Sequence, residues 1–205
     1  MSYLDDHVLR GMAKWPNVPA VYGWLALNRR GEWLIKGDIV SNPTISAFIG
    51  RNYERDAQGC WFFQNGPQRV FVTLDYTPHV YRAINGADRP LELVSHTGAR
   101  PPSIAGAWLD EDGTLLLDTA VGVGVVHDRD LDRVVPAFTD EHGRGLADAV
   151  LDERMVRVQQ GEDAPLAIGY CGATMRVGPV RSREVPRRFG FDPSPAPPAG
   201  HPECT

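Results

Sequence analysis

Five residues between Trp61 and Arg69 form the most chemically suggestive group in this sequence. They are Trp61, Phe63, Asn65, Gln68 and Arg69. A tight Asn65-Gly66-Pro67 turn beside aromatic rings and an arginine could present a small concave surface to a ligand or a partner. Turn chemistry alone also explains the Asn-Gly-Pro run. Recognition and a purely structural turn are therefore both open at this point.

The metal-ligating and nucleophilic residue types do not form a convincing site. None of the six histidines is spaced to place two imidazoles on one helix face or hairpin. His201, Cys204 and Cys171 could supply three ligands, but a chain terminus makes a poor preformed site. The run Gly169-Tyr170-Cys171-Gly172 could present a nucleophile flanked by glycines, yet the strand-like neighbours of Cys171 favour a buried apolar role. We predict no metal, no cofactor and no catalytic residue.

Two further motifs have structural explanations. The run Asp110-Glu111-Asp112-Gly113 faintly resembles a calcium loop, but it lacks the downstream bidentate Glu and fits a hairpin turn. The alternating glycines of residues 121–126 lack the third glycine and the strand–turn–helix context of a dinucleotide site. They favour a strand that another backbone approaches closely.

Length and charge limit the classes of function. The 205 residues suffice for one sizeable domain or two small ones, and the net charge of −5 gives no sign of nucleic acid or anionic membrane binding. A late cluster of arginines could grip an anion or simply pair with acids at a solvated edge. It comprises Arg176, Arg181, Arg183, Arg187 and Arg188.

The location predicted from the sequence is cytoplasmic. The acidic start lacks the pattern of a signal peptide, and no apolar run approaches the roughly 20 residues that span a bilayer. Three scattered cysteines suit free thiols in a reducing compartment.

The first half alternates short apolar strands with turns and one short helix. Strands are expected over residues 20–27, 32–35, 53–55, 60–63, 68–74 and 80–81. An amphipathic helix is expected over residues 4–14, because apolar side chains recur there at helical spacing. Asn42 before Pro43 predicts a capped helix that ends near residues 50–52.

The second half repeats landmarks of the first at a nearly constant offset, which predicts an internal duplication, with generic hairpins as the alternative. The matches pair Asn28 with Asp110, Asp56 with Asp140, residues 70–72 with 156–158, and Asp75 with Asp163. Asp128 and Asp130 offer caps for the second helix, residues 146–153 add another helix, and residues 166–171 and 173–177 form two closing strands.

These patterns predict an α+β fold of mostly antiparallel β structure, with two diverged hairpin–helix–hairpin repeats and short helices packed on the sheets. A hairpin with one short helix buries too little to be stable alone, so the copies should face each other or share one sheet. The expected divisions are a helical segment (1–19), a first repeat (20–84), a linker (85–106), a second repeat (107–190) and a proline-rich tail (191–205). The tail should be extended, either solvated, draped across a groove through Phe189 and Phe191, or docked on a partner.

Several runs carry a resemblance to known sequences, and they are residues 33–37, Phe48, Tyr53, 56–59, 63–72, Pro78 and 188–193. These runs resemble proteobacterial families of unknown function, known as conserved hypothetical proteins. A more distant resemblance is to a domain-of-unknown-function family. It implies a fold of repeated structural motifs and a role in signal transduction, and it brings no catalytic residues with it.

The leading hypothesis is a non-catalytic binding or regulatory module that recognises a small ligand or a protein partner. One alternative is a small hydrolase-type enzyme whose Asp/His pair is assembled by the fold. Another is an interaction scaffold that uses a sheet edge or the proline-rich tail. A homodimer is compatible with each, whereas nucleic acid and membrane are not expected partners.

Overall fold

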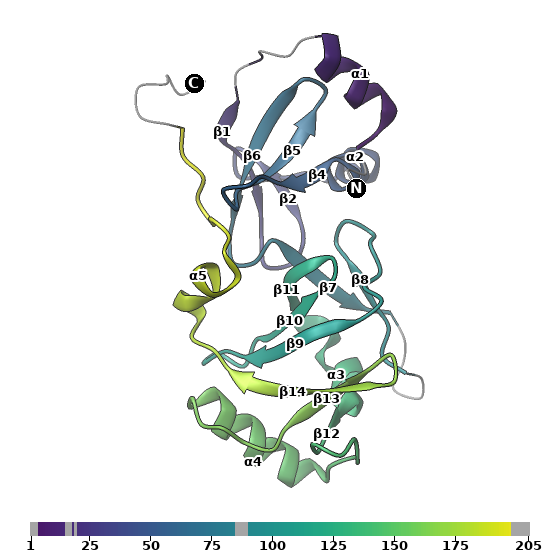
Figure 1. The fold of residues 1–205 in the computed structure, drawn as a ribbon, viewed down its shortest axis with the longest axis vertical. Coiled ribbons are helices and arrows are strands. Elements are labelled where there is room, and N and C mark those ends of the chain that lie inside the picture. Colours follow the sequence, from purple (N-terminus) through teal and green to yellow (C-terminus); the bar gives the residue numbers. More distant parts are fainter. Residues whose placement is uncertain (1–3, 15–17, 19, 85–89, 198–205) are drawn as a thin grey trace. The chain divides into compact units, whose positions relative to one another are not determined.

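The chain folds as an α+β protein with two β-sheets (Figure 1). The computed structural model describes residues 4–14, 18, 20–84 and 90–197. These form two compact units. Unit 1 comprises the described parts of Met1–Pro78 and Phe189–Thr205, and unit 2 comprises those of His79–Arg188. In the sequence, unit 2 therefore interrupts unit 1.

Unit 1 is a six-stranded sheet with two helices. Its elements are α1 (Asp6–Lys14), β1 (Val21–Leu27), β2 (Trp33–Ile35), β3 (Asp38–Ile39), α2 (Pro43–Arg51), β4 (Tyr53–Arg55), β5 (Trp61–Asn65) and β6 (Gln68–Leu74). The strand order is β3-β2-β1-β6-β5-β4. The central pair β1 and β6 is parallel, and the remaining neighbours are antiparallel.

Unit 2 is an eight-stranded sheet with short helices. Its strands are β7 (His79–Ala83), β8 (Leu93–Ser95), β9 (Ile104–Leu109), β10 (Leu115–Thr119), β11 (Gly122–Val126), β12 (Phe138–Thr139), β13 (Ala167–Tyr170) and β14 (Ala173–Pro179). Its helices are η1 (Asp128–Asp130), α3 (Leu131–Val134), η2 (Val135–Ala137), α4 (Asp148–Gln159) and η3 (Ser182–Glu184), with α5 (Val185–Phe189) at its end. The strand order is β12-β13-β14-β9-β10-β11-β7-β8.

The two sheets share a six-strand order. If β9 to β14 are matched in sequence with β1 to β6, the six strands of unit 2 have the same neighbours and the same relative directions as those of unit 1. In both sets the central pair is parallel, and it is β1 with β6 in unit 1 and β9 with β14 in unit 2. Unit 2 adds β7 and β8 beyond β11 and inserts α4 between β12 and β13. Each set of six strands thus belongs to its own sheet, and the two sets do not share one. Shared topology does not establish common ancestry, so the duplication remains a prediction.

Four turns share one side-chain hydrogen-bond pattern. In each, an Asn or Asp oxygen accepts bonds from the backbone N–H groups two and four residues later. A glycine with positive φ occupies the fourth position, where other residues are disfavoured. The four first residues are Asn28, Asp56, Asp110 and Asp140. Asp110 is therefore a turn residue in a hairpin, as predicted.

Two of the four matches proposed along the sequence are wrong in detail. Residues 156–158 lie in α4, whereas the strand that occupies the place of β6 in unit 2 is β14. Asp163 follows α4 and is no counterpart of Asp75, which follows β6. The helix prevails because Leu151, Met155 and Val158 recur at helical spacing and pack against the core of unit 2.

The helix caps agree with the sequence in one case and differ in the other. Asn42 accepts hydrogen bonds from the N–H groups of Thr44 and Ile45 at 2.9 and 3.3 Å, which confirms the predicted start of α2. After β11, His127 and not Asp130 caps the first helical turn, through its bond from Arg129 N. Asp130 is unavailable for capping because its carboxylate bonds to the Arg82 side chain and to Ala83 N.

The predicted divisions of the chain differ from the two compact units at several points. The stretch 85–106, expected as a linker, contains β8 and the start of β9. The first strand of unit 2, β7, belongs to what was expected as the first repeat. The tail is not simply solvated, because Phe191 and Pro195 are buried in the structure. Residues 198–205 lie outside the described residues.

Candidate functional site

An apolar groove of about 600 Å³ lies between α2 and one face of the sheet of unit 1. We call it the α2 groove. It is lined by Val21, Trp24, Leu25, Ile35, Ile45, Phe48, Ile49, Phe63, Asn65, Gln68 and Val70. Among these described residues none has an ionisable side chain, and the two polar ones carry neutral amides. The groove therefore suits the apolar part of a ligand.

An irregularity in β1 shapes one wall of the α2 groove. Val21 pairs with Val70 and Leu25 pairs with Val72, so β1 gains two residues relative to β6 over this stretch. Gly23 adopts a φ of 71° within it. Neighbouring residues of a regular strand point to opposite faces, but the bulge allows Trp24 and Leu25 to line the same groove.

Helix α2 supplies the opposite wall. Ile45, Phe48 and Ile49 lie at spacings of three and four residues, which places them on one helix face. The C-terminal end of α2 is fixed by Asn52, whose side-chain amide donates to Phe48 O at 2.9 Å. The Asn52 side-chain oxygen accepts from Asp5 N at 2.9 Å, which ties α2 to the segment before α1. These bonds hold the C-terminal end of the wall in place.

Three large apolar side chains of the groove remain open to solvent. Trp24, Ile35 and Ile45 are 37%, 44% and 46% exposed. Lys36 lies at the rim, in the tight turn between β2 and β3, with its Nζ 3.7 Å from the centroid of the Trp24 ring. This cation–π contact covers part of one wall and leaves the rest of the apolar surface uncovered.

The structure divides the five residues singled out in the sequence. Phe63, Asn65 and Gln68 line the α2 groove. Trp61 lies outside its lining and packs on Tyr53, with ring centroids 4.8 Å apart. Arg69 stacks on Phe62, with 4.6 Å between its Cζ and the ring centroid. Because Phe62 and Phe63 are neighbours in β5, they point to opposite faces, and Arg69 belongs to the other face.

Sequence reasoning missed Trp24 and Ile35 as groove residues. Both belong to segments correctly predicted as strands, and alternation would place Trp24 away from Leu25. The available signal was Gly23, because a glycine inside a strand pattern often marks a bulge. Ile45, Phe48 and Ile49 lie in the helix predicted to follow Asn42, but nothing in the sequence showed that part of this helix face is left uncovered.

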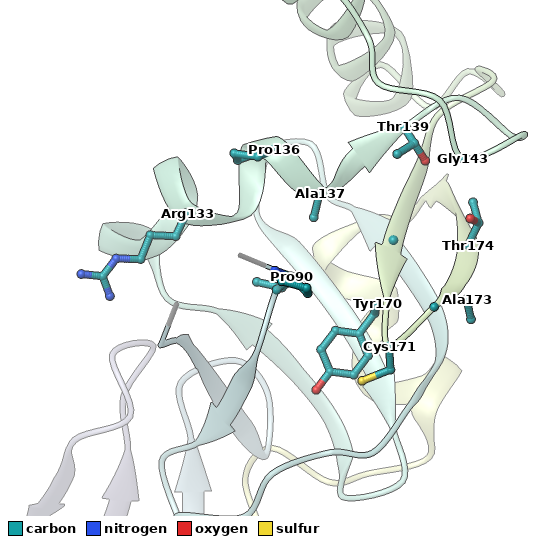
Figure 2. A pocket seen from close by; sticks show the side chains of 13 residues that line it. Pro90, Arg133, Pro136, Ala137, Thr139, Gly143, Tyr170, Cys171, Ala173 and Thr174 are labelled. Carbon is teal, nitrogen blue, oxygen red and sulfur yellow. The ribbon is translucent and has the colours of Figure 1, made fainter. Parts of the chain in front are cut away.

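A smaller cavity of about 310 Å³ lies in unit 2, between the helical turns after β11 and the β13–β14 hairpin. Figure 2 shows Arg133 and Pro136 on the helical side and Tyr170 and Cys171 at the end of β13. Its lining is polar as well as apolar. Tyr170 is held in place because its hydroxyl donates to Pro101 O at 2.6 Å, and burial raises its pKa to about 12.

Cys171 differs from its predicted buried role. It is exposed in the two-residue turn between β13 and β14, where it adopts a φ of 48° beside Gly172. Both central residues of such a hairpin turn need positive φ, so the strand pairing imposes this conformation on the cysteine. Its position follows from hairpin geometry.

The remaining candidate groups do not converge on one site. Arg176 pairs with Glu141 and Asp163, and Arg188 stacks on the Trp108 ring, so these two arginines of the late cluster have separate partners. Among the residues with described positions, no three potential metal ligands gather. His201 and Cys204 lie outside the described residues. Of the helices in that same part of the chain, none is both long and apolar enough to cross a bilayer.

The fold and the groove define an α+β protein built from two mixed sheets, with an apolar groove beside the first. The family DUF2944, described as "Protein of unknown function (DUF2946)", matches residues 4–196, and the chain belongs to this family. No curated protein matches the chain.

Two solved structures of the DUF1285 family are similar to it. A protein from Silicibacter pomeroyi DSS-3 shares 13% identity with a TM-score of 0.53, covering 80% of this chain and 85% of that chain. A protein from Shewanella baltica OS155 also shares 13% identity, with a TM-score of 0.38 over 52% of this chain and 85% of that one. At such identity the first likeness concerns the fold alone.

Proposed function

We propose that this protein is a non-catalytic binding module that holds the apolar part of a ligand in the α2 groove. The observation that carries the proposal is the partial exposure of Trp24, Ile35 and Ile45 around one cavity. Single exposed apolar side chains are ordinary, but several that converge on one cavity are typical of a binding site.

The lining supports binding in preference to catalysis. General acid–base chemistry needs a titratable group within hydrogen-bond reach of the substrate, and the described lining offers amides instead. Asn65 and Gln68 can orient a polar group of the ligand at the β5–β6 end of the groove. The proposal includes a regulatory role in signal transduction, which the distant family resemblance implies, and a cytoplasmic location, which the sequence predicts. The ligand is either a small molecule or a segment of a protein partner.

Binding of the neutral, environment-sensitive dye Nile red to the full chain tests the proposal. The variants Ile35→Glu and Ile45→Glu place a charge in the groove, and because these side chains are partly exposed the fold should tolerate them. We expect each variant to weaken dye binding at least tenfold, because a charge in an apolar site is costly to desolvate.

Ile39→Glu is the matched control. Ile39 is 55% exposed and pairs with Leu34, so it faces the side of the sheet opposite to Ile35. Its replacement should leave dye binding unchanged. Equal binding by all three variants and the wild type would show that the α2 groove is not the site.

A further inference from the structure

Strands β5 and β6 part at one end and leave a slot that residues 190–193 fill. Their pairing begins at Asn65 and Gln68 and extends to Phe62 and Phe71. Beyond that point, Gly59 O accepts a hydrogen bond from Asp192 N, and Leu74 N donates one to Pro193 O. We call this the strand slot. Its walls and its occupant all belong to unit 1.

Backbone groups hold the occupant in an extended conformation. Asp192 N donates to Gly59 O at 3.1 Å, and Leu74 N donates to Pro193 O at 2.8 Å. Asp192 also forms a parallel bridge with Cys60. Because Leu74 is only 4% exposed, its N–H needs a partner from the protein when water is kept out. The slot therefore requires an extended peptide, as in recognition by strand addition.

Side chains give the slot a preference. Phe191 is 7% exposed, so its ring is buried when the segment is seated. The Arg55 guanidinium donates to Gly190 O, and Gly190 adopts a φ of 66°, which favours glycine. Proline cannot donate a backbone hydrogen bond, but at Pro193 the slot needs only an acceptor, and the Pro193 carbonyl supplies it to Leu74 N.

The receiving side is equally specific. A Cβ on Gly59 would overlap the carbonyl oxygen of Gly190 and lie 3.2 Å from Phe191 Cα. Only a glycine at this turn leaves room for the segment. Gly37 has the same φ of 91°, but a Cβ there would meet nothing within 4 Å. Alanine at Gly37 therefore has only the cost of the positive φ, whereas alanine at Gly59 also has the cost of the clash with residues 190 and 191.

We infer that unit 1 contains a peptide-binding site, the strand slot, which recognises an extended Gly-Phe-Asp-Pro segment and is occupied by this chain's own residues 190–193. The occupant is a ligand covalently attached to its receptor. This site lies on contacts separate from the α2 groove, so it goes beyond the proposed function.

A fluorescent peptide with the sequence of residues 187–197 tests the inference on the full chain. The Phe191→Ala variant loosens the attached segment, so we expect it to bind the free peptide at least tenfold more tightly than the wild type does. The Gly59→Ala/Phe191→Ala double variant, and a peptide that carries alanine for Phe191, should each reduce this binding at least tenfold. Absence of binding to Phe191→Ala, or equal binding by the single and double variants, would overturn the inference.

Hydrogen exchange keeps the test decisive if Phe191→Ala does not fold. In the otherwise unchanged chain, Gly59→Ala should speed the exchange of the Asp192 and Leu74 amides together at least tenfold. Amides of the β5–β6 ladder should keep their protection, and Gly37→Ala should leave all of them slow. Unchanged protection of Asp192 and Leu74 in Gly59→Ala would show that the slot does not hold the segment.

Discussion

Asn28 and Asp110 make the same pair of hydrogen bonds in two different sheets. Asn28 Oδ1 accepts from Arg30 N and Glu32 N at 2.9 and 3.0 Å, and Asp110 Oδ1 accepts from Asp112 N and Thr114 N at 3.0 and 2.7 Å. Each closes the hairpin that joins the first two strands of its six-strand set. An amide and a carboxylate are therefore interchangeable in this role.

This equivalence predicts different costs for two substitutions of Asp110, which is fully buried. Asp110→Ala should lower the free energy of unfolding by about 2 kcal/mol, because two backbone donors lose their acceptor. Asp110→Asn keeps the acceptor and should cost less than about 1 kcal/mol. Urea unfolding curves measure both, and equal losses would contradict the assigned role.

The cap of α2 gives a second prediction. Asn42→Ala should lower the free energy of unfolding by about 1 kcal/mol, because the N–H groups of Thr44 and Ile45 lose their acceptor. Asn42→Asp retains a good capping oxygen and serves as the control. Thermal or urea unfolding distinguishes the two, and wild-type stability in Asn42→Ala would show that the cap contributes nothing.

Gly124 in β11 is packed directly against β7. A Cβ at this position would lie 2.6 Å from both His79 O and Tyr81 Cε2, which confirms the close backbone approach predicted from the alternating glycines. Gly124→Ala should therefore destabilise the protein by at least about 2 kcal/mol, since the strands must separate. Gly169 is the matched strand glycine, because its Cβ would meet nothing nearer than Ala137 O at 3.7 Å. Gly169→Ala should be within about 1 kcal/mol of the wild type, and similar losses in both variants would contradict the packing argument.

Two histidines of unit 2 predict a loss of stability in mild acid. Burial lowers the pKa of His79 from 6.5 to about 4, and burial together with the nearby His79 lowers the pKa of His96 as well. Their ring centroids are 5.6 Å apart. The two imidazoles bind protons more readily in the unfolded chain than in the folded one. The free energy of unfolding is therefore highest above about pH 6.5 and falls as the pH drops toward 4.

Urea unfolding at pH 7 and pH 5.5 measures this slope. Each histidine contributes at most about 1.4 kcal/mol per pH unit within the window. His79→Gln should flatten the slope whatever its effect on stability at pH 7. An unchanged slope would show that His79 does not carry the pH dependence.

The sequence predicted those features that depend on near neighbours. The Asn and Asp turns, the cap at Asn42 and most strands depend on hydrogen bonds or periodicities within a few residues. Such local patterns are present in the sequence whatever the tertiary structure. The same locality explains the error at residues 156–158. Val156 and Val158 alone fit a strand, and only the packing of Leu151, Met155 and Val158 against one core establishes the helix.

The sites depended on contacts between distant parts of the chain. The α2 groove exists because a bulge at Gly23 and the placement of α2 leave Trp24, Ile35 and Ile45 uncovered together, which no local pattern records. The strand slot joins Gly59 and Leu74 to residues more than a hundred positions away. The amino-acid sequence alone determined the turns, the cap and the α+β class. Only the tertiary structure decided which apolar surface stays open and where residues 190–193 are held, because both follow from long-range packing and backbone pairing.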